Sequence, residues 1–217
     1  MTGTEQPGLR RRRIDAVLVV VGTAATAVCA GFAAGPLPAS EREVFLALNN
    51  LPRRYELVAW PLQQLGMALA IPVGAILLAR LSKSWRTPVA LLAISTAFGW
   101  GAANLVREAV QRGRPPSFLD GVQLGYDVPD AGPAFPSGHA IVVWALIVVL
   151  APYLRSPTVV ALGVLALGVM ACRVYVGAHM PLDALGGAAY GVAVGGLSNL
   201  LGGITGKARV EFKVRHG

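Results

Sequence analysis

Residues 172–183 read CRVYVGAHMPLD and lie between two strongly apolar runs. The stretch carries an arginine, a histidine and an aspartate, and ionisable side chains beside a membrane segment are costly and usually functional. Gly177 and Pro181 inside it indicate a break in the chain. We therefore expect one helix to end near Arg173 and the next to begin near His179.

The apolar runs on either side belong to a pattern that extends over the whole chain. Of its 217 residues, 54% are hydrophobic and only 14% are charged, whereas about a quarter of the residues of a soluble domain are charged. We expect an all-α membrane protein with six transmembrane helices in one bundle. Its membrane domain would be 14–204, between basic tails at 1–13 and 205–217. The predicted helices are 14–35, 61–81, 87–106, 139–154, 157–176 and 182–203.

Positive charge is unevenly distributed between the two sides of this predicted bundle. Six spans place both termini on one side, and assigning that side to the cytoplasm gives it 12 of the 19 Lys and Arg residues, in agreement with the positive-inside rule. The net charge of +8 therefore indicates orientation in the cell membrane and not a nucleic-acid partner. Several arginines remain on the outer face, where orientation does not explain them.

The first group of outer arginines lies in Arg107-Glu-Ala-Val-Gln-Arg-Gly-Arg114-Pro115. Arginines seven residues apart lie nearly above one another on a helix, because seven residues make almost two turns. Pro115 disfavours helical geometry at the residue before it, so we expect the helix to end at Arg114. Taken alone, the stretch is more typical of a basic patch at the membrane edge.

A second polar stretch, Phe135-Pro136-Ser137-Gly138-His139, comes directly before an apolar run. Ser137 is well suited to cap the helix that follows, and the free N–H groups of the first turn, with the helix dipole, form a site for an anion. Gly138 allows the backbone to approach a ligand closely, and His139 would face that ligand. A capping or interfacial histidine is the plain alternative.

The third stretch is the one from 172 to 183. His179 and Asp183 are four residues apart, so they can share one face at the start of the last helix. An aspartate that accepts a hydrogen bond from one ring nitrogen fixes the tautomer and leaves the other nitrogen as a nucleophile or base. Arg173 belongs to the preceding helix. An ordinary salt-bridged loop is the alternative.

Together, three arginines, two histidines, an aspartate and a helix N-terminus describe a site for phosphoryl transfer. We expect no metal and no cofactor, because arginines repel a cation and the sequence has no dense cluster of cysteine, histidine and carboxylate ligands. Cys29 and Cys172 lie in apolar surroundings without metal-ligand spacing. The sequence also lacks the Gly-x-x-x-x-Gly-Lys-Ser/Thr loop of nucleotide-binding proteins.

In this order, the three stretches resemble the motifs of the type 2 phosphatidic acid phosphatase superfamily, which includes membrane lipid phosphatases, soluble acid phosphatases and vanadium haloperoxidases. Its pattern is Lys, six residues and Arg-Pro; then Pro-Ser-Gly-His; then Ser-Arg, five residues, His, three residues and Asp. The spacings match throughout 107–183. Two residues depart from the pattern: Arg107 replaces the usual lysine and keeps its charge, and Cys172 replaces a serine with a weaker hydrogen-bond donor.

The resemblance implies a mechanism for the site. His179 would attack phosphorus and form a phosphohistidine, with Asp183 orienting the ring. His139 would protonate the leaving oxygen and then activate water in the second step. The phosphoryl oxygens would be held by Arg107, Arg114, Ser137, Gly138 and Arg173.

An active site at the outer membrane surface suits a lipid whose phosphate lies among the headgroups. The resemblance favours polyprenyl diphosphate as the substrate, ahead of phosphatidate or phosphatidylglycerophosphate and of a polyprenyl-phosphosugar. Transfer of the phosphoryl group to a lipid or sugar hydroxyl is the alternative reaction. A non-catalytic lipid-binding or transport protein is the alternative of another class. The sequence leaves open the oligomeric state and the role of residues 36–60.

Overall fold

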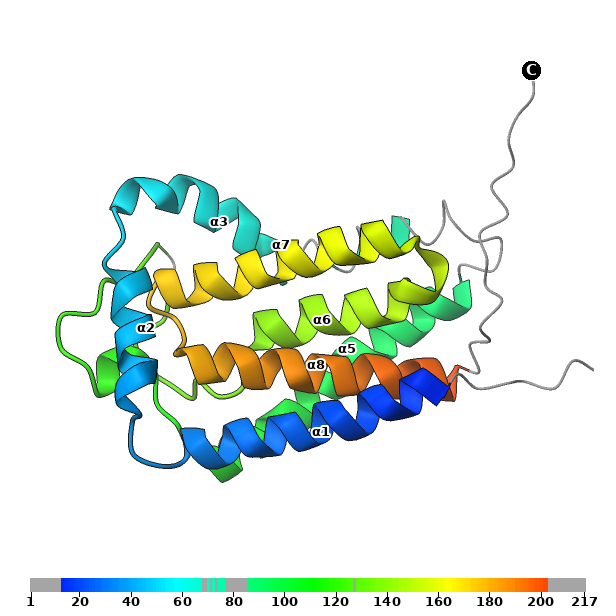
Figure 1. Cartoon of the computed structure of the whole chain (residues 1–217), viewed down its shortest axis with the longest axis horizontal. Coiled ribbons are helices and arrows are strands. Elements are labelled where there is room, and N and C mark those ends of the chain that lie inside the picture. The colour runs from blue at the N-terminus through cyan, green and yellow to red at the C-terminus, as the bar shows by residue number, and fades with distance from the viewer. Residues whose placement is uncertain are drawn as a thin grey trace, which may run out of the picture.

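The computed structural model describes residues 13–67, 70, 72, 74–76, 86–126 and 128–202. In this part of the chain all regular elements are helices, which confirms the all-α prediction. Five longer helices run side by side, and two shorter ones lie at one end of them (Figure 1). The longer helices are α1 (Arg13–Ala33), α5 (Arg86–Val110), α6 (Gly138–Leu150), α7 (Ser156–Tyr175) and α8 (Pro181–Leu201), and the shorter ones are α2 (Ala39–Asn49) and α3 (Glu56–Gln64).

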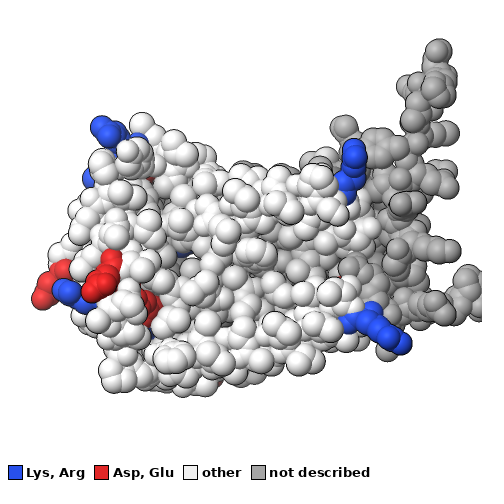
Figure 2. Space-filling model, viewed as in Figure 1, with Lys and Arg blue, Asp and Glu red and all other residues white. Residues whose placement is uncertain are grey.

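Three of the long helices have the character of membrane spans. By length and composition, α1, α7 and α8 are apolar enough to cross a membrane, and α6 is apolar but shorter. Figure 2 shows charged side chains at the two ends of the molecule and an uncharged surface between them. Large apolar side chains such as Val20, Val160 and Val164 are exposed on the long helices, where lipid tails of matching polarity can cover them.

The second predicted span, 61–81, is only partly described. Its first residues belong to α3, which ends at Gln64 and is followed by a turn at 65–67. Most of the remaining residues of this span lie outside the described residues, as does almost all of the predicted tails 1–13 and 205–217.

A column of glycines lets helix α8 pack closely against α6. Gly187, Gly191 and Gly195 are four residues apart, so they lie on one face of the helix, and a Cβ on any of them would collide with α6. At Gly191 the collision is with the backbone carbonyl of Ile141. Small residues at this spacing allow two membrane helices to approach closely. The start of α8 is thereby fixed beside the start of α6.

Buried polar groups join α1, α6 and α8 at the opposite end of the bundle. The Asn199 amide donates to Asp15 Oδ1 at 3.1 Å and to the Val148 carbonyl at 3.0 Å. Asn199 and Asp15 are each 1% exposed. Because a buried amide is costly unless it is hydrogen-bonded, this cluster specifies how the three helices pack together.

Residues 36–60 form a support for the long loop that follows α5. They contain α2, a 3-10 turn at Arg53–Tyr55 and the first residues of α3. At the end of α2, the buried Asn49 amide donates to the carbonyls of Gln123 and Tyr175, both at 2.8 Å, and its Oδ1 accepts from the Gln123 N–H at 2.9 Å. Residues 36–60, whose role the sequence left open, are therefore largely helical and anchor this loop.

We expect Gly191→Val to destabilise the protein by roughly 1–3 kcal/mol, because the larger side chain has no room between α8 and α6. Gly163→Val on α7 is the matched control, since a Cβ there meets nothing within 4 Å. The measurement is the temperature at which the detergent-solubilised protein loses its monodisperse peak in size-exclusion chromatography. An equal loss in both variants would contradict the packing explanation.

Candidate active site

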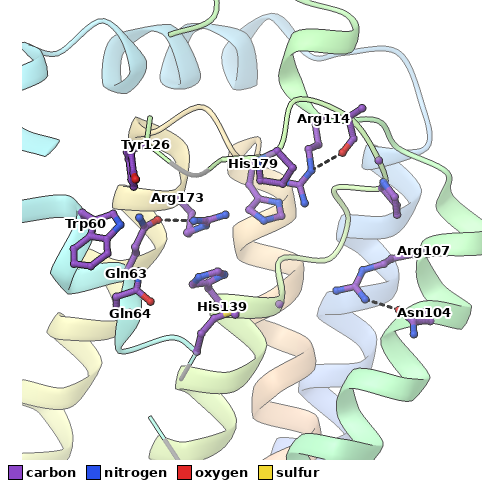
Figure 3. A pocket seen from close by; sticks show the side chains of 16 residues that line it. Trp60, Gln63, Gln64, Asn104, Arg107, Arg114, Tyr126, His139, Arg173 and His179 are labelled. Atoms are coloured by element: carbon purple, nitrogen blue, oxygen red, sulfur yellow. Dashed lines mark hydrogen bonds between the residues drawn. The ribbon is translucent and has the colours of Figure 1, made fainter. Parts of the chain in front are cut away.

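The three polar stretches of the sequence meet at the end of the bundle where α2 and α3 lie. A backbone hydrogen bond joins two of them directly, because the Ser137 N–H donates to the Asp183 carbonyl at 2.9 Å. The stretches border a cavity of about 520 Å³. Three arginines and two histidines line this cavity in Figure 3: Arg107, Arg114, His139, Arg173 and His179.

The break between α7 and α8 positions Arg173 and His179. Helix α7 ends at Tyr175 and α8 begins at Pro181, each within one residue of the predicted ranges 157–176 and 182–203. Gly177 adopts φ +71° in the turn, and a Cβ there would lie 2.8 Å from the backbone of a neighbouring loop. Glycine is required at such a position. The His179 N–H donates to the Arg173 carbonyl at 3.3 Å, which keeps the two residues together.

Asp183 lies behind the His179 ring. Its carboxylate is fully buried, and Oδ2 accepts a hydrogen bond from the Met180 N–H at 2.8 Å. The same oxygen lies 3.7 Å from His179 Nδ1, which is longer than a hydrogen bond, and this nitrogen has no hydrogen-bond partner among the described residues. Because Nδ1 is turned toward the carboxylate, Nε2 on the other side of the ring faces the cavity that His179 lines.

Arg173 reaches the cavity from the last turns of α7. Its side chain is buried, and NH1 donates to Oε1 of Gln63 in α3 at 2.5 Å. The sequence prediction missed Gln63, although Gln63 and Gln64 stand at the start of an apolar predicted span, where polar side chains usually mark function. Cys172, which replaces the family's serine, is not among the residues that line the cavity and packs against apolar side chains of α3 and α7.

Arg107 and Arg114 do not share a helix, so the prediction that the helix ends at Arg114 is wrong. Helix α5 ends at Val110, and Gln111 turns the chain with φ +50°. Left-handed backbone is uncommon for a glutamine, and the sequence does not reveal it. Arg107 remains on α5 and lines the cavity, with its guanidinium donating to Asn104 Oδ1 at 2.6 Å.

The chain runs extended after this turn, through a bridge between Gly113 and Pro133. Side chains alternate along an extended chain, so Arg112 and Arg114 point in opposite directions. Arg114 points to the cavity and donates to the carbonyl of Ala178 at 2.9 Å, directly beside His179 in the sequence. The loop thus delivers the second predicted arginine to the site by a route different from the predicted helix.

Arg112 lies between two carboxylates, a role that the sequence prediction did not assign to it. Its side chain is 7% exposed and donates to both oxygens of Glu41, at 3.0 and 2.6 Å, and to Asp183 Oδ1 at 3.1 Å. Glu41 belongs to the first turn of α2. Because 71 residues separate Glu41 from Arg112, no local spacing could have identified the pair.

Helix α6 begins at Gly138, with Ser137 in the N-cap position. The Ser137 hydroxyl makes no capping hydrogen bond, and its fully buried oxygen has no partner in the structure. Gly138 and His139 both line the cavity, and His139 and His179 lie on facing sides of it (Figure 3). The first turn of α6 therefore borders the cavity.

A family model of the PAP2 superfamily matches residues 87–203, which are more than half of the chain. This chain belongs to the PAP2 superfamily. All eight predicted site residues fall within the matched region, whereas Glu41 and Gln63, which contact Arg112 and Arg173, precede it.

Two solved structures have a similar fold. LpxE from Aquifex aeolicus matches with a TM-score of 0.65 and 23% identity, over 74% of this chain and 95% of its own. A PAP2-type phosphatidylglycerolphosphate phosphatase from Bacillus subtilis matches with a TM-score of 0.63 and 20% identity, over 85% of this chain and 93% of its own. No curated protein matches the sequence. The chain is thus a membrane phosphatase with the PAP2 fold.

Burial sets the charge state of the central histidine in this PAP2 site. It lowers the pKa of His179 below the ordinary value of 6.5. The positive charges of Arg173 and Arg114 act in the same direction, whereas the Asp183 carboxylate opposes them. The imidazole is therefore neutral at physiological pH, which is the form that can act as a nucleophile.

This lowered pKa predicts how stability depends on pH. The unfolded chain binds a proton at His179 more readily than the folded protein, so this contribution to stability is complete above about pH 6.5 and is lost as the pH falls through the folded pKa. His179→Asn removes the titrating group. We expect the unfolding temperature of the wild type to fall relative to that of His179→Asn as the pH is lowered from about 7.5 to 5.

The control is His216→Asn, in the basic C-terminal tail, which should follow the wild type. Both histidine variants retain His139, so its titration cancels in the comparison. Parallel curves for the wild type and His179→Asn over this pH range would contradict a lowered pKa at His179.

Proposed function

We propose that this PAP2 phosphatase hydrolyses the phosphate ester or diphosphate of a membrane lipid through a phosphohistidine at His179. One observation carries the proposal: His179 faces the cavity with Asp183 behind its ring, and His139 lies across from it. A buried neutral imidazole backed by a carboxylate has the arrangement of an activated nucleophile, and the facing histidine that of a general acid and base.

The reaction would proceed in two displacements. In the first, Nε2 of His179 forms a bond to phosphorus as the bond from phosphorus to the lipid oxygen breaks, and His139 gives that oxygen its proton. In the second, His139 takes a proton from water, whose oxygen attacks phosphorus and releases inorganic phosphate from His179. Asp183 would stabilise the positive charge that the imidazole ring carries in between.

The arginines of the cavity would hold the phosphoryl oxygens as charge develops on them. Arg114 and Arg173 donate to neutral acceptors, a backbone carbonyl and the Gln63 amide, so these bonds leave their charge available to an anion. The unpartnered Ser137 hydroxyl and the first-turn N–H groups of α6 are further candidate donors to phosphate.

Metal independence is part of the proposal. Among the described residues that line the cavity, the charged side chains are arginines and none is a carboxylate. Such a lining attracts a phosphate and repels a divalent cation, so the arginines would take the part that metal ions have in many phosphotransferases.

For the substrate, we propose polyprenyl diphosphate first, on the family resemblance. Phosphatidylglycerophosphate is the second candidate, because one of the similar structures is a phosphatidylglycerolphosphate phosphatase. We further propose six spans within the membrane domain 14–204, with both terminal tails in the cytoplasm and the active site on the outer face of the plasma membrane. The excess of Lys and Arg that this arrangement assigns to the cytoplasmic side supports it.

The first test is phosphate release by the purified protein in detergent with EDTA, from polyprenyl diphosphate, phosphatidate and phosphatidylglycerophosphate in parallel. We expect release with EDTA present and a loss of more than about 1,000-fold in His179→Ala, because the nucleophile is removed. His216→Ala should retain full activity. Loss of activity with EDTA, or an active His179→Ala, would refute the mechanism, and a phosphorylated acceptor without free phosphate would indicate phosphotransfer.

The second test traps the intermediate. With p-nitrophenyl phosphate, whose leaving group needs little protonation, His139→Asn should slow the second step by roughly 100- to 10,000-fold and let phosphoenzyme accumulate. The phosphoryl group bound to the protein should be acid-labile and base-stable, and mass spectrometry should place it on His179. A protein-bound phosphoryl group that survives acid, or one that also forms in His139→Asn/His179→Ala, would rule out a phosphohistidine at this position.

A further inference from the structure

A buried ionic network stands behind the catalytic residues. One nitrogen of Arg112, NH1, lies 3.0 Å from Glu41 Oε1 and 3.1 Å from Asp183 Oδ1, and NH2 lies 2.6 Å from Glu41 Oε2. The three side chains are 7%, 4% and 0% exposed. Neither Arg112 nor Glu41 is among the residues that line the catalytic cavity. A contact with the phosphate therefore does not explain them.

Backbone contacts hold the network in register with the site. The Ala134 N–H donates to the Arg112 carbonyl at 2.8 Å, next to the bridge that fixes the extended loop. Glu41 Oε1 also accepts from the Leu182 N–H at 2.9 Å, in the first turn of α8, where a helix favours negative charge. Glu41 thus fixes both the cation and the helix start that carries Asp183.

We propose that Arg112 and Glu41 are positioning residues that keep Asp183 ionised and fixed against His179. Arg112 supplies the positive charge that a buried carboxylate requires, and Glu41 holds the guanidinium in the bidentate geometry that presents it to Asp183. The inference rests on the proposed function, because a fixed negative charge behind His179 matters most when that ring becomes a positively charged phosphohistidine.

The charge count of the network gives the inference a distinct signature. Two buried carboxylates share one cation, so loss of that cation leaves two like charges, and one of them should take up a proton. The other groups that act on these carboxylates are His179 beside Asp183, Arg114 on the neighbouring loop, and Cys29 of α1 near Glu41. Glu41 and Asp183 themselves remain the only carboxylates that contact Arg112 in the described structure.

The test compares Arg112→Gln, Arg112→Lys and the double variant Glu41→Gln/Arg112→Gln with p-nitrophenyl phosphate from pH 4.5 to 9. We expect Arg112→Gln to lower kcat by roughly 10- to 100-fold, by analogy with the loss seen when the partner that orients a metal-binding side chain is removed. KM should change little. The acid limb of its kcat profile should move to higher pH. The double variant should return this limb toward the wild-type pH, because one carboxylate is removed together with the cation.

Arg112→Lys keeps the cation in place and tests the charge if Arg112→Gln does not fold. Its acid limb should stay at the wild-type pH, although kcat should fall because lysine lacks the planar fork. Arg155→Gln, at the start of α7, is the control and should behave as the wild type.

An unchanged kcat and acid limb in folded Arg112→Gln, an effect on KM alone, or an acid limb that shifts in Arg112→Lys would each overturn the inference while the wild-type activity stands. A wild type that releases no phosphate from p-nitrophenyl phosphate or any lipid of the panel would overturn the proposed function first, and this inference with it.

Discussion

The buried carboxylate of Asp183 is the constraint on which this end of the molecule depends. A carboxylate without exposure is tolerated only when its charge and its lone pairs are met. Here a backbone N–H donates to the carboxylate and the guanidinium of Arg112 balances its charge, whereas the His179 ring lies 3.7 Å away. Arg112 and its partner Glu41 come from segments far from Asp183 in the sequence, and the Asp183 carbonyl also accepts from the start of α6. The helices must therefore assemble around this residue.

The arginines of the site fall into two electrostatic classes. Arg112 is neutralised by carboxylates and is part of the support of the site. Arg114 and Arg173 are oriented by carbonyl and amide oxygens, which fix a guanidinium without cancelling its charge. The protein can thus fix these two charged guanidinium groups in place before the substrate arrives. Preorganised charge of this kind does not have to be reoriented during the reaction.

The sequence located the parts of the site that depend on local signals. Gly177 and Pro181 indicated the break that separates Arg173 from His179, and the four-residue spacing placed Asp183 against His179. Where the prediction assumed a regular helix, it failed, since the left-handed Gln111 ends α5 early.

The supporting contacts of the site were not predicted from the sequence, for a different reason. Glu41 and Arg112 are 71 residues apart, and Gln63 and Arg173 are 110 apart. Such pairs form because α2 and α3 pack on the end of the bundle, and the spacing of residues along the sequence does not predict this packing.

The length of α7 has a kinetic consequence. Its 20 residues rise by about 1.5 Å each, so the helix is about as long as the hydrocarbon core is thick. If α7 crosses the membrane, Arg173, near its end, would lie at the depth where acyl chains give way to headgroups. A lipid could present its phosphate there without leaving its leaflet. The enzyme would then encounter its substrate by lateral diffusion in two dimensions. Its rate would depend on the mole fraction of that lipid in the leaflet, which other lipids lower, and not on the amount of lipid per volume of solution.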